Sequence, residues 1–167
     1  LVVLPVIFYT PETRMAAGLG GLYTFRPGKS ETKAKPSSLL FALVYTQNKQ
    51  FVIQCKPELY LKEEKYFLAT SLSLEKFPEK FYGIGNNTPE AMVEDYTPRT
   101  VAVELSFQKK IWPKEKIYVV LQYHFQEMKI LKFEKEDGML ARREVPGTQG
   151  GMSSGAGFIL KLDSRDN

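Results

Sequence analysis

Apolar and polar residues alternate one by one over much of this chain, in segments that polar turns separate. The clearest segment is 100–110, where large apolar side chains at 101, 103, 105 and 107 alternate with small or polar ones. A period of two residues puts the two sets on opposite faces of a β-strand. The same alternation recurs and predicts eight strands, at residues 3–10, 14–26, 38–46, 50–60, 66–76, 100–110, 117–126 and 152–163.

The connections between these strands differ in length according to the rim on which they fall. Turns 11–13 and 47–49 are tight, whereas 77–98 and 129–150 are long, polar and rich in Gly, Pro, Asn and Glu. If consecutive strands run antiparallel, these four connections share one rim and the connections 27–36, 61–65 and 111–116 share the other. Long loops confined to one rim are typical of outer-membrane proteins. We therefore predict an all-β fold, an antiparallel up-and-down transmembrane β-barrel.

The contents of the two strand faces favour a membrane barrel over a soluble one. A small soluble barrel packs large apolar side chains inside and exposes polar ones, whereas a membrane barrel does the reverse. Here one face is apolar, and the other carries many Gly, Ala and Ser residues beside polar ones, which suits a crowded or hydrated lumen. We predict a polar network in that lumen, made of Gln54, Lys56, Glu58, Glu104, Gln122, His124, Asp163 and Arg165.

Aromatic residues gather towards the strand ends, among them Tyr23, Tyr45, Tyr66 and Trp112. Aromatic rings at both membrane interfaces are expected of a membrane barrel. Aromatic residues also favour strands in general, so this observation alone does not decide. A soluble β-barrel or sandwich that binds a lipid-like ligand in its interior is the alternative.

Charge and composition exclude several other classes of protein. The net charge is +4, from 23 basic and 19 acidic residues spread along the chain, so no nucleic-acid partner is expected. Cys55 is the single cysteine, which excludes an internal disulfide and a CxxC motif. The apolar run Leu1–Tyr9 is too short for a bilayer-spanning helix, which needs about 20 apolar residues. No cofactor and no metal ion is expected.

Four segments carry a resemblance to a known family: Pro5–Arg14, Lys76–Asn86, Tyr96–Arg99 and Leu162–Asn167. In this order, over nearly the whole chain, they resemble the BamA/TamA family of outer-membrane proteins, also called the bacterial surface antigen family. The resemblance implies a barrel of about sixteen strands, of which residues 1–167 would form the N-terminal half as one partial domain. Two departures from the family are that no POTRA-like repeats precede the strands and that the later Arg-Gly-Phe/Tyr loop motif is absent.

The resemblance also implies a location, partners and a role. These are the bacterial outer membrane, outer-membrane lipids together with other membrane or periplasmic proteins, and the assembly, insertion or export of outer-membrane proteins. For such a role the first strand would pair weakly with the last, open, and template an incoming strand through backbone hydrogen bonds. Pro5, Val6, Ile7 and Phe8 would form this seam strand, with Pro5 removing one donor. Alternatively, Pro5 only begins an ordinary strand.

Candidate catalytic and metal-binding residues have structural explanations, so no enzyme activity is expected. His124 is the only histidine and would need Ser106 or Ser73 beside it to act as a base, whereas a lumen histidine bonded to a neighbour needs no such coincidence. Arg165 stands between Asp163 and Asp166, which favours a salt-bridge network over a metal site.

Two glycine-containing segments have similar explanations. Gly18 and Gly20 share one strand face, which indicates close backbone packing or barrel curvature. The segment with Phe81, Tyr82, Gly83, Gly85 and Asn86 predicts an ordered loop folded over the rim; a surface contact for a partner or ligand is the alternative. Because half of a larger barrel would leave two unpaired edges, we expect the chain alone to aggregate or to pair with other chains.

Overall fold

The computed structural model describes residues 1–11, 13–27, 35–86, 88–89, 92–112 and 116–163. Within these residues the chain is all-β, because the alternating segments extend and pair with their sequence neighbours. The strands are β1 (Val2–Thr10), β2 (Arg14–Phe25), β3 (Ser37–Thr46), β4 (Phe51–Leu61), β5 (Tyr66–Lys76), β6 (Glu79–Phe81), β7 (Glu94–Trp112), β8 (Ile117–Phe133) and β9 (Gly151–Leu162).

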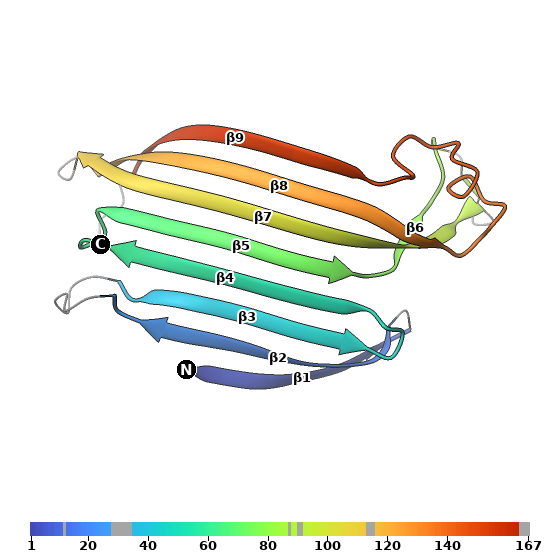
Figure 1. The fold of residues 1–167 in the computed structure, drawn as a ribbon, viewed down its shortest axis with the longest axis horizontal. Coiled ribbons are helices and arrows are strands. Elements are labelled where there is room, and N and C mark those ends of the chain that lie inside the picture. Colours follow the sequence, from blue (N-terminus) through green and yellow to red (C-terminus); the bar gives the residue numbers. More distant parts are fainter. Residues whose placement is uncertain (12, 28–34, 87, 90–91, 113–115, 164–167) are drawn as a thin grey trace.

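The described strands form one antiparallel, up-and-down sheet in the order β1-β2-β3-β4-β5-β7-β8-β9, with the short β6 paired to β7. All eight predicted strands are present, and β6 is an addition. The sheet is open: β1 and β9 lie at its opposite edges (Figure 1). The predicted up-and-down topology is thus confirmed, whereas the sheet does not close into a barrel.

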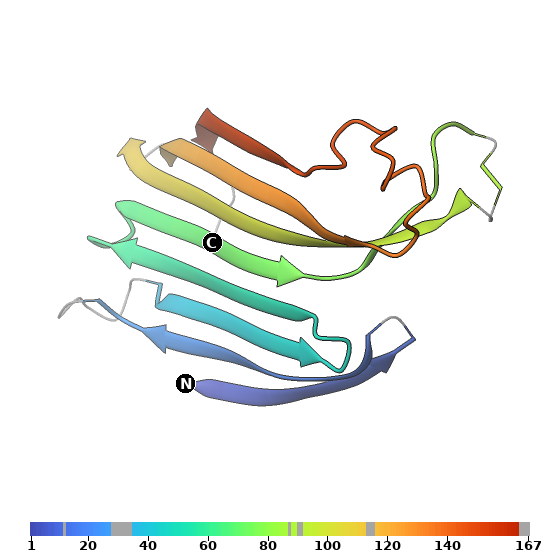
Figure 2. The same cartoon turned by 45° about the vertical axis from the view of Figure 1, so that its right-hand side comes forward.

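The connections fall on the two rims as the alternation predicts, but the two long ones are shorter than expected. β7 begins at Glu94 and β8 continues to Phe133, so that Tyr96 pairs with Phe133 inside the predicted loops. Pro98 hides this extension in the sequence, since a proline reads as a strand end. The structure accommodates it at a bulge between Thr97 and Pro98. Figure 2 shows β6 and the 134–150 segment at the same end of the sheet.

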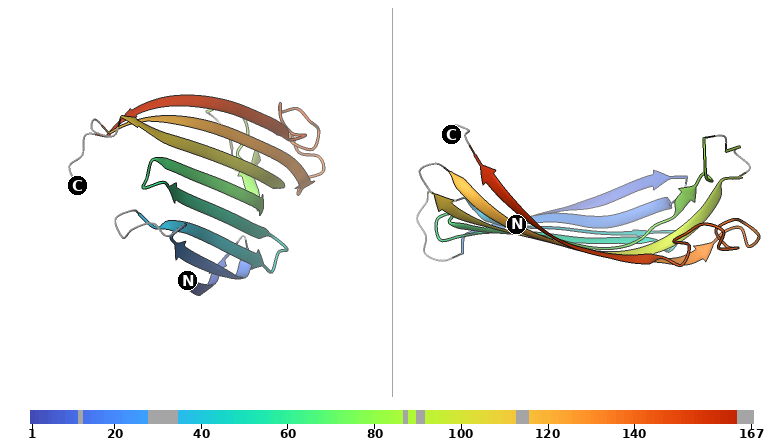
Figure 3. Two further views of the ribbon diagram at one scale, coloured as in Figure 1. Left: turned by 60° about the vertical axis from the view of Figure 1, so that its left-hand side comes forward. Right: turned by 90° about the horizontal axis from the view of Figure 1, so that it is seen from above.

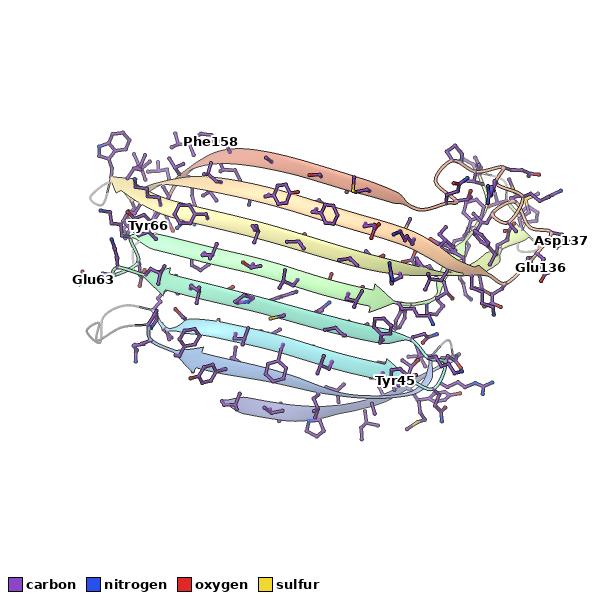
Figure 4. The ribbon with its side chains drawn as sticks, viewed as in Figure 1. Tyr45, Glu63, Tyr66, Glu136, Asp137 and Phe158 are labelled. Atoms are coloured by element: carbon purple, nitrogen blue, oxygen red, sulfur yellow. The ribbon has the colours of Figure 1, made fainter. Side chains whose placement is uncertain are left out.

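The cross-strand register brings most large apolar side chains of the central strands to one face and most polar ones to the other. Across the middle of the sheet, Leu43 lies opposite Ile53, and Leu72 lies opposite Val103. Figure 4 looks at this sheet with its side chains drawn; its labelled Tyr45, Tyr66 and Phe158 all belong to this apolar face by register. Because a slip by one residue would move a strand's whole apolar set to the other face, the pattern itself specifies this register.

The sheet has almost no core of its own. Among the described residues, the only buried apolar side chains are Ala16, Pro98, Val120 and Leu140. The sheet bends along its strands (Figure 3, right), and none of the described segments forms a second layer over either face of its middle. Among the described residues, no helix is long and apolar enough to cross a bilayer.

Gly18 is required by the close approach of β2 and β3. A Cβ atom at this position would collide with the backbone carbonyl oxygen of Leu43. Gly21 is also confined, since its Cβ would lie 2.5 Å from the ring of Phe41. Gly20 has room for a side chain, so the predicted close packing holds for Gly18 and not for Gly20.

Candidate functional site

The residues of the predicted lumen network share one face of the sheet, here called the polar face. Glu104 lies opposite His124, and Gln54 lies opposite Ser73. Lys56, Glu58 and Gln122 occupy the same face by register. Asp163 follows the end of β9, and Arg165 and Asp166 lie outside the described residues.

These residues form two separate pairs and not one continuous network. His124 Nδ1 lies 3.6 Å from Glu104 Oε1, with 44% of the histidine side chain and 64% of the glutamate side chain exposed. Gln54 donates a hydrogen bond to Glu75 Oε1 at 3.1 Å. Glu75 was missing from the predicted set, although its place on the polar side of segment 66–76 could have indicated it. The His124–Glu104 pair is open to solvent and contributes little to stability, whereas the Gln54–Glu75 hydrogen bond is partly buried.

A hollow of about 480 Å³ lies on the polar face over β5, β7, β8 and β9. Small residues make the room: Gly155 lies opposite His124, and Gly157 lies opposite Gln122. The hollow identifies the polar face as the concave side of the bent sheet. Its lining on this face is Ala69, Ser71, Glu104, Ser106, Gln122, His124, Gly155 and Gly157.

Ser106 lies close to His124 in the register of β7 and β8, but the two side chains form no hydrogen bond with each other. Ser106 lies opposite Gln122, and no side-chain hydrogen bond of Ser106 is present in the part of the chain that the structure describes. Ser73 lies opposite Ala102, farther along the strands. A nucleophile paired with its base is therefore not assembled. Among the described residues, no group of His, Cys, Asp and Glu side chains could hold a metal ion.

The opposite face carries a band of apolar side chains that contains no charged residue between its two limits. On the described strands of this face, charged residues occur only near the band's two limits: Lys76, Arg99, Glu127 and Lys129 at one end and Lys109 at the other. From Arg99 to Lys109 the strand runs roughly 33 Å at about 3.3 Å per residue. A strand tilt of about 40° would lower the height of this band to roughly 25 Å.

The apolar band is exposed. Leu121 retains 52% of its surface and Leu160 retains 65%. A contiguous apolar surface on this scale is not a feature of soluble monomers, which bury such faces or cover them with a partner. Aromatic side chains stand near both limits of the band, with Tyr23 and Tyr66 towards one end and Tyr9 and Tyr45 towards the other.

The free edge of β1 carries the predicted seam residues. Gln47 N donates to Met15 O at 2.9 Å, which shows that the backbone of Met15 points from β2 towards β3. The direction of the backbone N–H and C=O groups alternates along a strand, so those of Leu19 also point towards β3. The backbone groups of Pro5, the partner of Leu19, therefore point away from β2. Pro5 therefore removes a donor from the free edge and not from the β1–β2 ladder. It lies within β1 and does not begin it.

The other free edge, β9, has no such interruption. Asp163 N donates to Lys116 O at 3.1 Å, so the odd-numbered residues of β9 point towards β8 and the even-numbered residues point outwards. Phe158 and Leu160, whose backbone N–H and C=O groups point away from β8, also have exposed apolar side chains. An exposed, regular and apolar edge of this length is a site for pairing with another strand.

A buried carboxylate, which sequence reasoning missed, fixes the 134–150 segment over the rim. Glu94 is only 5% exposed, and its two oxygens accept hydrogen bonds from the backbone N–H groups of Met139 (2.7 Å) and Leu140 (3.1 Å). Gly138 makes the approach possible, because a Cβ there would collide with the Glu94 carboxylate. The sequence offers no signal for this contact, since its partners are 45 or 46 residues apart.

The predicted rim loop begins at the end of β6, where Phe81 lies opposite Glu94. Phe81 ends β6, and Gly83 and Gly85 adopt positive φ angles of 88° and 101°, which favour glycine. Tyr82 is 62% exposed. Beyond the end of β5, the Tyr96 hydroxyl donates to Glu79 Oε2 at 2.7 Å; burial first, and then Glu79, raises the pKa of Tyr96 to about 12.

Comparisons with known proteins leave this chain without an assigned family. No family model, no curated protein and no solved structure matches it.

Proposed function

We propose that this chain forms part of the wall of an outer-membrane β-barrel, with its apolar face in contact with lipid and its polar face towards the lumen. The observation that carries the proposal is the exposed, charge-free apolar band opposite a concave polar face. Its height of roughly 25 Å matches the outward apolar band of transmembrane barrels. Lipid would supply the cover that the sheet lacks, since the described residues bury almost no apolar side chains among themselves.

The soluble alternative has less support. A soluble barrel that binds a lipid-like ligand needs a concave apolar interior. The hollow of this sheet has a mixed lining, in which Ser71, Glu104, Gln122 and His124 stand beside apolar residues such as Ala69 and Leu105. A lipid-like ligand placed there would desolvate polar groups without replacing their hydrogen bonds.

A role in the assembly, insertion or export of other proteins follows from the resemblance to the BamA/TamA family. The free edge of β1 supports it, because Val3, Ile7 and Tyr9 present unpaired backbone groups outwards while Pro5 interrupts their row of donors. Such an edge pairs incompletely with a neighbour and can exchange it for another strand. Barrel membership rests on the faces of the sheet, whereas the assembly role rests on this edge and on the resemblance.

Heat modifiability tests the barrel directly. The native protein, detected in the outer-membrane fraction with an antibody against segment 134–150, should migrate differently in unheated and boiled samples. The chain 1–167 refolded alone in detergent should show no such shift, because its two edges remain unpaired. A chain that stays monomeric and strand-rich in water without detergent would overturn the proposal in favour of a soluble barrel.

A further inference from the structure

The two rims of the sheet balance their charges differently. At the rim of the long connections, cations pair with carboxylates: Lys129 with Glu127 and Lys132 with Glu134, both at 2.8 Å, and Arg142 with Glu144 at 3.3 Å. The opposite rim, here called the basic rim, carries an excess of cations. Its charged residues in the described ranges are the cations Arg26, Lys35, Lys62, Lys65, Lys109, Lys110, Lys116 and Lys161 and the carboxylates Glu63, Glu64 and Asp163.

Three of these lysines surround one aromatic side chain, Tyr66. The Nζ atoms of Lys62 and Lys65 lie 5.7 Å and 5.8 Å from the centre of its ring, and Lys109 is its cross-strand partner on β7. Phe107 stacks on the same ring with a centroid distance of 5.9 Å. We call these five residues the Tyr66 cluster. Figure 4 shows Tyr66 at the end of the sheet, next to the turn that contains Glu63.

The Tyr66 cluster stands at the limit of the apolar band. Tyr66, Phe107 and Lys109 share the apolar face. From them the band extends along β5 and β7 to Lys76 and Arg99 near the other rim. An aromatic ring at this depth, with ammonium groups just beyond it, matches the boundary between lipid chains and headgroups.

Glu63 and Glu64 lie in the same turn as Lys62 and Lys65, but no ion pair joins them to the lysines of this cluster. Within the described part of the chain, Lys62, Lys65 and Lys109 form no ion pair. The nearby Glu64 uses Oε1 to accept the backbone N–H of Lys35 at 2.9 Å. Three ammonium groups that form no ion pair in the described structure, next to one aromatic ring, suit a phosphate group.

We propose that the Tyr66 cluster binds the phosphate of an anionic phospholipid headgroup, so that the basic rim lies in a leaflet that contains such lipids. This inference rests on the proposed membrane location. It adds an orientation: the rim of the long connections faces the opposite side. Lysines near an anionic surface each contribute a severalfold preference for it, which salt screens.

Trp112 is a built-in reporter for this rim. It is the only tryptophan in the chain, it is 56% exposed, and its partner Ile117 places it on the apolar face. It follows Lys109 by roughly 10 Å along the strand. A lipid bound at the cluster therefore lies within the first shell of lipids around the indole ring.

Quenching of Trp112 fluorescence by brominated lipids tests the inference. The chain of residues 1–167, in which Trp112 is the single tryptophan, is reconstituted in phosphatidylcholine vesicles that contain a minor fraction of either brominated phosphatidylglycerol or brominated phosphatidylcholine. We expect at least about twofold stronger quenching by the anionic lipid, lost at high salt. The triple variant Lys62→Gln, Lys65→Gln, Lys109→Gln should quench equally with both lipids. The matched control, Lys49→Gln, Lys76→Gln, Lys80→Gln at the other rim, should retain the preference.

The outcomes separate this inference from the proposal beneath it. Equal quenching of the unchanged chain by both lipids would overturn the anionic-lipid site and leave the membrane location standing. An equal loss of preference in both triple variants would assign the effect to overall charge and would also overturn the site. No quenching by any brominated lipid would contradict the membrane location itself.

Discussion

At the scale of single residues, the best-defined interaction in the molecule is that of Glu94. Its carboxylate is nearly inaccessible, yet it stabilises a segment of 134–150 that has few apolar contacts of its own beyond Leu140. Hydrogen bonds from backbone N–H groups to a charged acceptor are about twice as strong as neutral ones. The order of the long connection at this rim therefore depends on one side chain of β7.

Replacing Glu94 by Ala should release the 134–150 segment without unfolding the sheet. The loss of two charge-assisted hydrogen bonds should cost roughly 2–3 kcal/mol locally. Hydrogen exchange at the amides of Met139 and Leu140 should then accelerate by about 30- to 150-fold. The exposed Glu136 provides the control, since Glu136→Ala also removes one carboxylate at this rim without removing a hydrogen bond to Met139 or Leu140. Equal acceleration in both variants would assign the effect to the lost charge and not to the two hydrogen bonds that Glu94 accepts.

At the scale of elements, β1 has a continuous row of N–H donors on the edge that pairs with β2 and an interrupted row on its free edge. Its N–H groups at even positions point to β2, whereas the outer edge lacks a donor at Pro5. Natural sheets place proline on edge strands in this orientation because it weakens pairing with other chains. Sequence reasoning identified the strand and its proline, and the direction of Pro5 needed the register of the neighbouring strands.

Substitutions on β1 should therefore have opposite consequences at adjacent positions. Pro5→Val restores an outward donor and should increase the fraction of cross-linked dimers in detergent, with the β1–β2 pairing intact. Val6→Pro removes an inward donor and should destabilise the β1–β2 ladder by roughly 1–3 kcal/mol, the cost of one lost ladder hydrogen bond. Cross-linking and strand content by circular dichroism distinguish the two effects. The assignment of the edges is wrong if Pro5→Val lowers strand content while Val6→Pro leaves it unchanged.

At the scale of the whole molecule, the period of two residues predicted most of the fold. It predicted the strands, their order and the common face of Gln54, Glu104 and His124. This works because side chains alternate between the two faces, so the burial pattern of a strand also fixes its register with its neighbours. It did not predict the extension of β7 past Pro98, where pairing with β8 overrides a local breaker. Nor could it predict Glu94, since contacts between distant loops leave no periodic signal in a sequence.

The two-faced sheet is the central claim, and the single cysteine tests it most directly. Cys55 lies in the middle of the apolar band, opposite Phe41 and Leu72, and its neighbour Gln54 lies on the polar face. Maleimides react with thiolates, which an apolar surrounding disfavours. In vesicles, a water-soluble maleimide should leave Cys55 unmodified but should label the Gln54→Cys, Cys55→Ser variant, and denaturant should make both reactive. Rapid labelling of Cys55 in intact vesicles, at the rate seen for that variant, would contradict a lipid-facing apolar side.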